Sequence, residues 1–208
     1  MSSLRFHFLG SSRIVHEERG ALPFKGRKAL ALLSYVAVES KKVHARDALM
    51  GLFWSEMSHK DAQNNLRVTL ARINKGLGDA SSYLVTSKHS IQFRPDANVW
   101  MDVLAFEDII SDYQAHSHED ITVCSDCHEK LVKAAELYQG DVLADLYLSD
   151  SEVFNEWQLT QQERIRLKAS SLFSDLLSIY EQKQDYEQAE HYARQLIELE
   201  FFHEAAQR

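Results

Sequence analysis

The 208-residue sequence has no long hydrophobic segment and only two cysteines. No run approaches the roughly 18 apolar residues that a membrane span needs, and residues 1–10 lack the basic start and apolar stretch of a signal peptide. Cys124 and Cys127 are so close in sequence that a bridge between them would close only a tiny loop. These absences argue against a membrane protein and against a secreted disulfide-stabilised one. We therefore expect a cytoplasmic chain with no membrane partner.

Catalytic motifs are absent as well. The sequence contains no G-x-x-x-x-G-K-[ST], no G-x-S-x-G and no G-x-G-x-x-G pattern. Glu152, Glu156 and Glu163 recur at helical intervals near Trp157, which is more typical of a solvated helix face than of a catalytic pair of acids. The sequence therefore predicts a protein that is not an enzyme.

The formal net charge of -8 is unevenly distributed along the chain. Residues 1–100 hold 15 Lys and Arg against 8 Asp and Glu, a net +7, whereas residues 101–208 hold 8 against 23, a net -15. A basic part followed by an acidic part indicates polyanion binding in the first, and solvation or protein contact in the second. Two ordinary solvated surfaces are the alternative.

The basic part reads as strands, then helices, then a hairpin. Apolar alternation predicts strands in residues 4–9 and on both sides of a turn at 18–20, and helical spacing predicts helices in 26–40 and 44–54. Two β-rich runs, Tyr83–Thr86 and Ile91–Phe93, enclose a polar tip and predict a hairpin. This order of elements is typical of a winged helix-turn-helix domain.

A third helix is predicted over residues 61–78, with Asp61 near its start and Gly78 just past its end. Leu66, Leu70, Ile73 and Leu77 form its apolar stripe. No acid occurs between Ala62 and Gly78. The face opposite the stripe carries Asn64, Arg67, Val68, Ala71, Arg72 and Lys75.

That face suits the major groove of DNA. Asn and Arg can form bidentate hydrogen bonds with base edges, Val can touch a thymine methyl group, and Lys can neutralise phosphate. A basic amphipathic helix on a solvated surface is the alternative, and the surrounding order of elements favours DNA.

The sequence resembles the SARP-type bacterial transcriptional activators. The matching segments span nearly the whole chain: "FLG", "GRKALALLSYV", "HARDALMGLFW", "AQNNLRVTLARINKGLG", "YLVTS", "MDVLAFE", "LYQGDVLADL" and "EW". The resemblance implies a response-regulator-like winged helix followed by an all-helical bacterial transcriptional activation domain. It also implies that the loop from Ser55 to Lys60 faces RNA polymerase.

Candidate DNA contacts follow from the helix face and from this resemblance together. On the third helix they are Asn64, Asn65, Arg67, Val68, Arg72 and Lys75, and at the tip of the wing the resemblance adds Lys88 and His89. The tip reads "SKHS", whereas relatives often have a glycine-rich tip.

The acidic part is helical by period, with one glycine, Gly140, and no proline after residue 100. The segment from Ala169 resembles one tetratricopeptide repeat, with Tyr180 and Ala189 in expected positions and a turn at 185–186. Because one repeat rarely folds alone, we expect helices around 131–138 and 154–166 to stack on it. Ala193 and Phe201 depart from the repeat pattern, and a generic helical bundle is the alternative.

A cluster of histidines and cysteines, "HSHEDITVCSDCH", lies between the predicted helices. His116, His118, Cys124 and Cys127 are candidate ligands of a structural zinc ion, because thiolates and imidazoles complete its tetrahedron. The missing signal peptide argues against a c-type haem, and the missing βαβ setting argues against a redox pair. A polar loop with incidental thiols is favoured over zinc, so no cofactor is predicted.

Together these patterns predict an α+β winged helix-turn-helix over residues 1–98 and an all-α tetratricopeptide-like domain over 99–208. The predicted function is a sequence-specific transcriptional activator with three partners: double-stranded DNA, RNA polymerase and a second copy of the chain. One alternative is a helical scaffold whose basic domain docks an acidic protein, and a weaker one is a metal-linked sensor. Because residues 197–208 still read as helix, we expect the native chain to continue.

Overall fold

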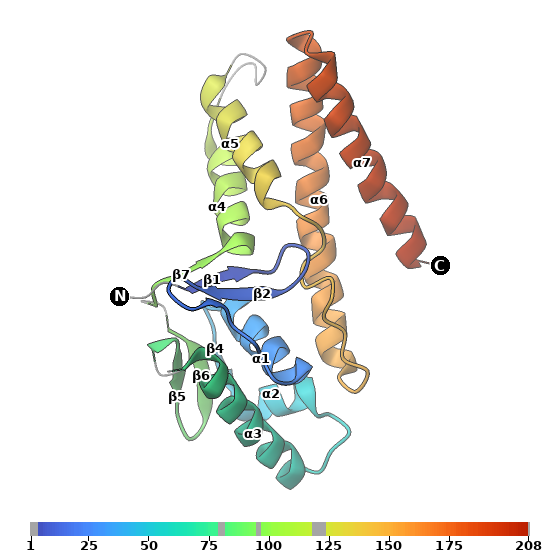
Figure 1. Ribbon diagram of the computed structural model, residues 1–208. Coiled ribbons are helices and arrows are strands. Elements are labelled where there is room, and N and C mark those ends of the chain that lie inside the picture. The colour runs from blue at the N-terminus through green and yellow to red at the C-terminus, as the bar shows by residue number, and fades with distance from the viewer. Residues whose placement is uncertain (1–3, 79–81, 95–96, 118–123, 208) are drawn as a thin grey trace. The chain divides into compact units, whose positions relative to one another are not determined.

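The computed structural model describes residues 4–78, 82–94, 97–117 and 124–207 (Figure 1). They form two compact units. The first unit comprises residues 1–101 together with 143–160, and the second comprises 102–142 together with 161–208. The long helix α6 (Glu152–Gln182) contributes its first turns to the first unit and the rest to the second.

The first unit begins with a four-stranded sheet in the order β3-β2-β1-β7. The strands β1 (Leu4–His7), β2 (Arg13–His16) and β3 (Gly20–Ala21) pair antiparallel, which confirms the small sheet predicted from the sequence. The strand β7 (Val99–Met101), which was not predicted, lies parallel to β1. Alternate side chains of β1 are buried, so its apolar residues face the core.

Three helices and a hairpin follow in the predicted order. They are α1 (Arg27–Val38), α2 (Arg46–Phe53), α3 (His59–Leu77), β5 (Leu84–Thr86) and β6 (Ser90–Phe93). A further strand, β4 (Val43–Ala45), pairs with β6 and gives a second sheet in the order β4-β6-β5. In the predicted helix stripes, Leu33, Ala37, Leu49 and Phe53 are buried, whereas Leu30 and Leu52 are only half-buried.

Residues 143–160 complete the core of the first unit. The ring of Phe154 is fully buried 5.1 Å from that of Phe53, and the ring of Trp157 lies 4.8 Å from that of Tyr35. The Trp157 indole N–H donates a hydrogen bond to Glu39 Oε1 at 3.1 Å. A segment more than 40 residues beyond β7 in sequence therefore belongs to the same core as the three helices.

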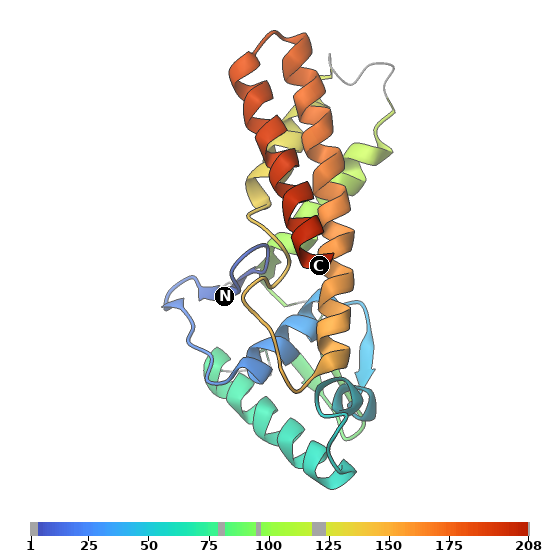
Figure 2. The same ribbon diagram turned by 90° about the vertical axis from the view of Figure 1, so that its right-hand side faces the viewer.

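The second unit contains α4 (Asp102–Ala115), α5 (Ser125–Leu137), residues 161–182 of α6, and α7 (Tyr186–Gln207). Figure 2 shows α6 and α7 side by side, and the rings of Tyr180 and Tyr192 stack between them at 5.6 Å. The helix α7 begins at the predicted turn. The tetratricopeptide character of this pair stays a prediction.

An ion-pair cluster joins α4 to α6 within the second unit. Glu107 contacts both Arg164 and Lys168, and the Lys168 Nζ lies 2.7 Å from its carboxylate. Burial alone would raise the pKa of Glu107, but hydrogen bonds from Lys168 and Arg164 hold it below its usual range. No helix in the described ranges is both long enough and apolar enough to cross a membrane.

Candidate nucleic-acid interface

Both ends of α3 are defined by side-chain and backbone chemistry. The Ser58 hydroxyl accepts a hydrogen bond from the Asp61 N–H at 3.2 Å and donates one to the Asp61 carboxylate at 2.7 Å. The negative charge of Asp61 in the first turn and the positive charge of Lys75 in the last turn both interact favourably with the helix dipole. At the other end, Gly78 has φ of 86°, a conformation that favours glycine. The sequence therefore specifies a helix of 19 residues with fixed ends.

One face of α3 is buried against the first unit. Leu66, Ile73 and Leu77 are at most 1% exposed, as the predicted stripe requires. Leu70, predicted for the same stripe, is only half-buried, and Thr69 is buried in its place at 4% exposure. At 100° per residue, Thr69 and Leu70 lie on the two opposite flanks of the stripe. The helix therefore packs on the core with its Thr69 flank.

Beyond its first turn, the opposite face of α3 is exposed and contains no acid. The one acid of the helix, Asp61, lies in the first turn and is hydrogen-bonded to Ser58. The exposed residues along this face are Asn64, Arg67, Val68, Ala71, Arg72 and Lys75. The Arg67 guanidinium donates a hydrogen bond to Asn64 Oδ1 at 3.0 Å, so these two side chains are oriented together. The face combines hydrogen-bond donors and acceptors with positive charge on a helix that its buried side holds in place.

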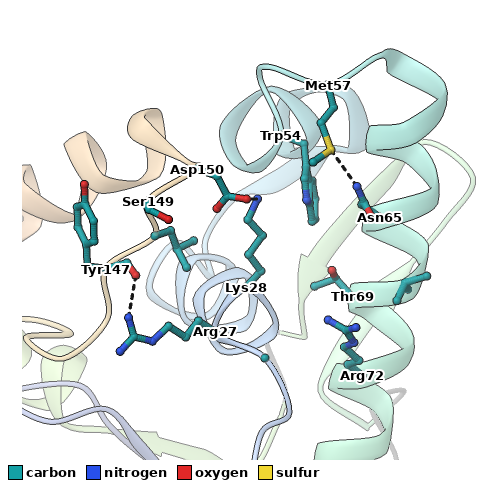
Figure 3. A pocket seen from close by; sticks show the side chains of 13 residues that line it. Arg27, Lys28, Trp54, Met57, Asn65, Thr69, Arg72, Tyr147, Ser149 and Asp150 are labelled. Carbon is teal, nitrogen blue, oxygen red and sulfur yellow. Dashed lines mark hydrogen bonds and ion pairs between the residues drawn. The ribbon is translucent and has the colours of Figure 1, made fainter.

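Asn65 and Arg72 lie at one edge of this face, beside a cleft of about 430 Å³ (Figure 3). Asn65 is half-buried, and its side-chain amide lies 3.0 Å from the Met57 sulfur. The Arg72 guanidinium packs against Gly26, where an added Cβ would lie only 3.2 Å from it. Of the predicted DNA contacts on α3, these two are therefore the most engaged with the protein itself.

Two cations at the other edge were missed by the sequence analysis. Arg46 and Lys60 line a depression together with Asp61, Gln63, Asn64 and Arg67. The Arg46 Nε donates a hydrogen bond to the Ser87 carbonyl at 2.9 Å, which connects the start of α2 to the hairpin tip. Arg46 is the first residue of α2 and Lys60 the second residue of α3, so both lie in the first turn of a helix.

The tip of the β5–β6 hairpin closes without glycine. The Ser87 hydroxyl accepts hydrogen bonds from the backbone N–H groups of His89, at 3.1 Å, and Ser90, at 2.9 Å. Lys88 and His89, the two predicted contacts, are exposed on this tip. The "SKHS" sequence therefore forms a tight turn in which serine side-chain hydrogen bonds take the place of glycine.

The predicted metal ligands lie in the second unit. Candidate ligand atoms of His116, Cys124 and Cys127 lie within 4.8 Å of one another, whereas His118 is outside the described residues. Burial and the neighbouring Cys124 raise the pKa of the Cys127 thiol to about 11. This thiol is therefore neutral at physiological pH.

No protein-family model and no curated protein sequence matches the chain. A comparison with solved structures finds EmbR of Mycobacterium tuberculosis, determined in complex with a low-affinity phosphopeptide. The TM-score is 0.63 at 17% sequence identity, and the match covers 94% of this chain but 59% of EmbR. The chain thus shares the fold of that part of EmbR, a small N-terminal sheet region followed by a mostly helical part.

Proposed function

We propose that this chain is a sequence-specific, double-stranded DNA-binding transcriptional regulator of the SARP type. The observation that carries the proposal is the exposed face of α3, which carries no acid beyond Asp61 in the first turn. Asn64 and Arg67 have the chemistry to read base edges, and Lys75 has the chemistry to bind phosphate. A carboxylate in the middle of this face would repel the DNA backbone, and the only acid of α3 lies in its first turn, hydrogen-bonded to Ser58.

The fold of EmbR supports the same class of function. EmbR is a SARP-family regulator and not an enzyme, so we propose a non-enzymatic role here too. The phosphopeptide belongs to the EmbR structure. Because this chain spans 59% of EmbR, phosphopeptide binding is not part of the proposal.

In the proposed complex, α3 enters the major groove and the hairpin acts as the wing. Lys88 and His89 at its tip would contact the flanking backbone, and Arg46 and Lys60 would add phosphate contacts between wing and helix. The hydrogen bond from Arg46 to Ser87 supports this arrangement. It connects the tip of the wing to the start of α2, and Arg46 lines the same depression as Lys60 at the start of α3.

The proposed activator role assigns the loop before α3 to RNA polymerase. Of the predicted segment from Ser55 to Lys60 this loop comprises residues 55–58, because His59 and Lys60 belong to α3. Every residue of this loop is exposed, and Met57 is an apolar side chain 43% accessible to solvent. A Glu56→Ala variant should then bind DNA normally but activate less transcription in a reconstituted system. We propose that the second unit supplies dimer or polymerase contacts.

The test of the function is a gel shift of the full chain against pooled genomic fragments, followed by sequencing of the retained DNA. The proposal expects a small set of fragments with a shared site, and loss of that selection in Arg67→Ala. Arg13→Ala is the matched control, because Arg13 is an exposed arginine of the same unit on β2. Uniform retention of all fragments, or none, would favour a scaffold that docks an acidic protein.

A further inference from the structure

The end of α4 and the start of α5 bring a histidine and two cysteines together. His116 directly follows α4, Cys124 is the residue that precedes the first turn of α5, and Cys127 lies within that turn. Cys127 is completely buried, whereas Cys124 and His116 are partly accessible. The CxxC spacing alone could be incidental, but the placement of His116 beside it is a separate result of how α4 and α5 pack.

From this arrangement we propose that His116, Cys124 and Cys127 bind one thiophilic divalent cation, most simply Zn²⁺. The site is independent of the proposed DNA binding, because all three ligands belong to the second unit.

The distances between the ligand atoms suit a tetrahedral metal. The His116 Nδ1 lies 2.9 Å from the Cys127 sulfur and 3.8 Å from the Cys124 sulfur. Usual Zn–S and Zn–N bond lengths at tetrahedral angles place a ligand nitrogen about 3.6 Å from each ligand sulfur. Side-chain shifts of less than about 1 Å would therefore admit the ion.

The ligand types select the class of metal. Two thiolates with one imidazole favour zinc over calcium or magnesium, which prefer oxygen ligands. Binding of the cation would displace the thiol protons of both cysteines. The His116 side chain is 38% exposed, so solvent can reach the cluster and a water molecule can take the fourth position.

An ion pair lies close to the histidine. Asp126 Oδ2 lies 3.8 Å from His116 Nδ1 and 2.9 Å from Lys130 Nζ, so the carboxylate already has a cationic partner on α5. With the metal bound, the two thiolate charges would be balanced by the dication. The metal would connect the end of α4 to the start of α5, and its loss should lower the thermal stability of the second unit.

The test uses the full chain, reduced and kept free of oxygen so that no disulfide can form. Metal analysis should find one zinc per chain, and titration with Co²⁺ should give the visible and thiolate charge-transfer absorption of tetrahedral coordination. Cys124→Ser and His116→Ala should each lose this absorption while retaining the helical circular dichroism of the wild type. His191→Ala removes an exposed histidine from α7 of the same unit and should bind as the wild type does.

Two results would overturn the site. One is the absence of stoichiometric metal in the reduced wild-type chain. The other is metal binding that Cys124→Ser and His116→Ala leave unchanged, which would mean adventitious association elsewhere. If the site is real, chelation should lower the melting temperature and leave DNA binding by the first unit intact.

Discussion

At the scale of single residues, the candidate contacts on α3 differ in what already surrounds them. Asn64 and Arg67 pair with each other on the exposed face, whereas Asn65 contacts Met57 and Arg72 packs on Gly26. A side chain that a protein contact already orients loses less freedom on binding. Arg72 is exposed, so it remains a candidate for base contact, while Asn65 is half-buried against Met57 and is better placed to shape the α2–α3 loop.

Lys75 should position the protein on DNA without reading sequence. It lies about three helical turns beyond Asn64, where a recognition helix leaves the groove floor. Lys75→Ala should weaken binding to specific and random duplexes alike and reduce the salt slope by about one unit. Titrations at several salt concentrations measure this, with Lys41→Ala, an exposed lysine outside α3, as the control. A loss confined to the specific site would contradict the assignment.

Glu107 should stabilise the second unit in a pH-dependent way. Its folded-state pKa is lowered, so its contribution to stability is present above its unfolded pKa and is lost as the pH falls through the folded value. Glu107→Gln should lower the free energy of unfolding by about 1 kcal/mol at pH 7, because the pair is partly exposed. Denaturation at pH 7 and at about pH 3 checks this. An equal difference at both pH values would show that the ionised carboxylate is not responsible.

At the scale of elements, the capping of α3 is the local feature most open to test. Ser58→Ala removes the hydroxyl that accepts the Asp61 N–H, and it should cost about 1 kcal/mol of stability. Ser55→Ala is the control, since Ser55 is an exposed serine in the same loop. Urea denaturation of both variants gives the comparison. Equal stability of the two variants would mean that the cap contributes nothing.

Elements with a strong period were predictable, and short ones were not. The helix α3 and the β5–β6 hairpin follow from apolar spacing, a helix-ending glycine and a polar tip. The strand β4 has three residues, of which only His44 is buried, so it has no apolar alternation to detect. Which of Thr69 and Leu70 is buried depends on the helices that pack against α3. Sequence period gives the stripe only to within about one residue of helix rotation.

At the scale of the whole molecule, packing brings together segments that lie far apart in sequence. No local sequence pattern can predict such contacts. Phe53 meets Phe154, and the Ser151 hydroxyl donates a hydrogen bond to the Phe53 carbonyl at 2.9 Å. The domain boundary predicted at residue 98 stays a prediction. The compact first unit contains residues 143–160 in addition to residues 1–101. The residue types of the metal cluster were visible in the sequence, but the approach of His116 to the thiols required the packing of α4 on α5.

The contribution of residues 143–160 gives a stability prediction for the first unit. Phe154→Ala should cost about 3–5 kcal/mol, because it leaves a cavity beside Phe53 in a fully buried site. Leu159→Ala, which alters an apolar residue of the same helix that is 62% exposed, should change stability by less than about 0.5 kcal/mol. For the same reason, a fragment ending at residue 98 should bind DNA more weakly than the full chain. Equal stability of the two variants would contradict this account of the core.

The central claim is that the exposed face of α3 reads DNA sequence. Its most direct measurement is titration of Asn64→Ala, Arg67→Ala and Arg72→Ala on the selected site and on random duplexes, at several salt concentrations. Replacement of a base-reading residue should cost about 1–3 kcal/mol on the selected site and relax preference at one base pair, with little effect on random DNA. If all three variants keep the specific-to-random ratio of the wild type, α3 does not read DNA and the proposed function is wrong.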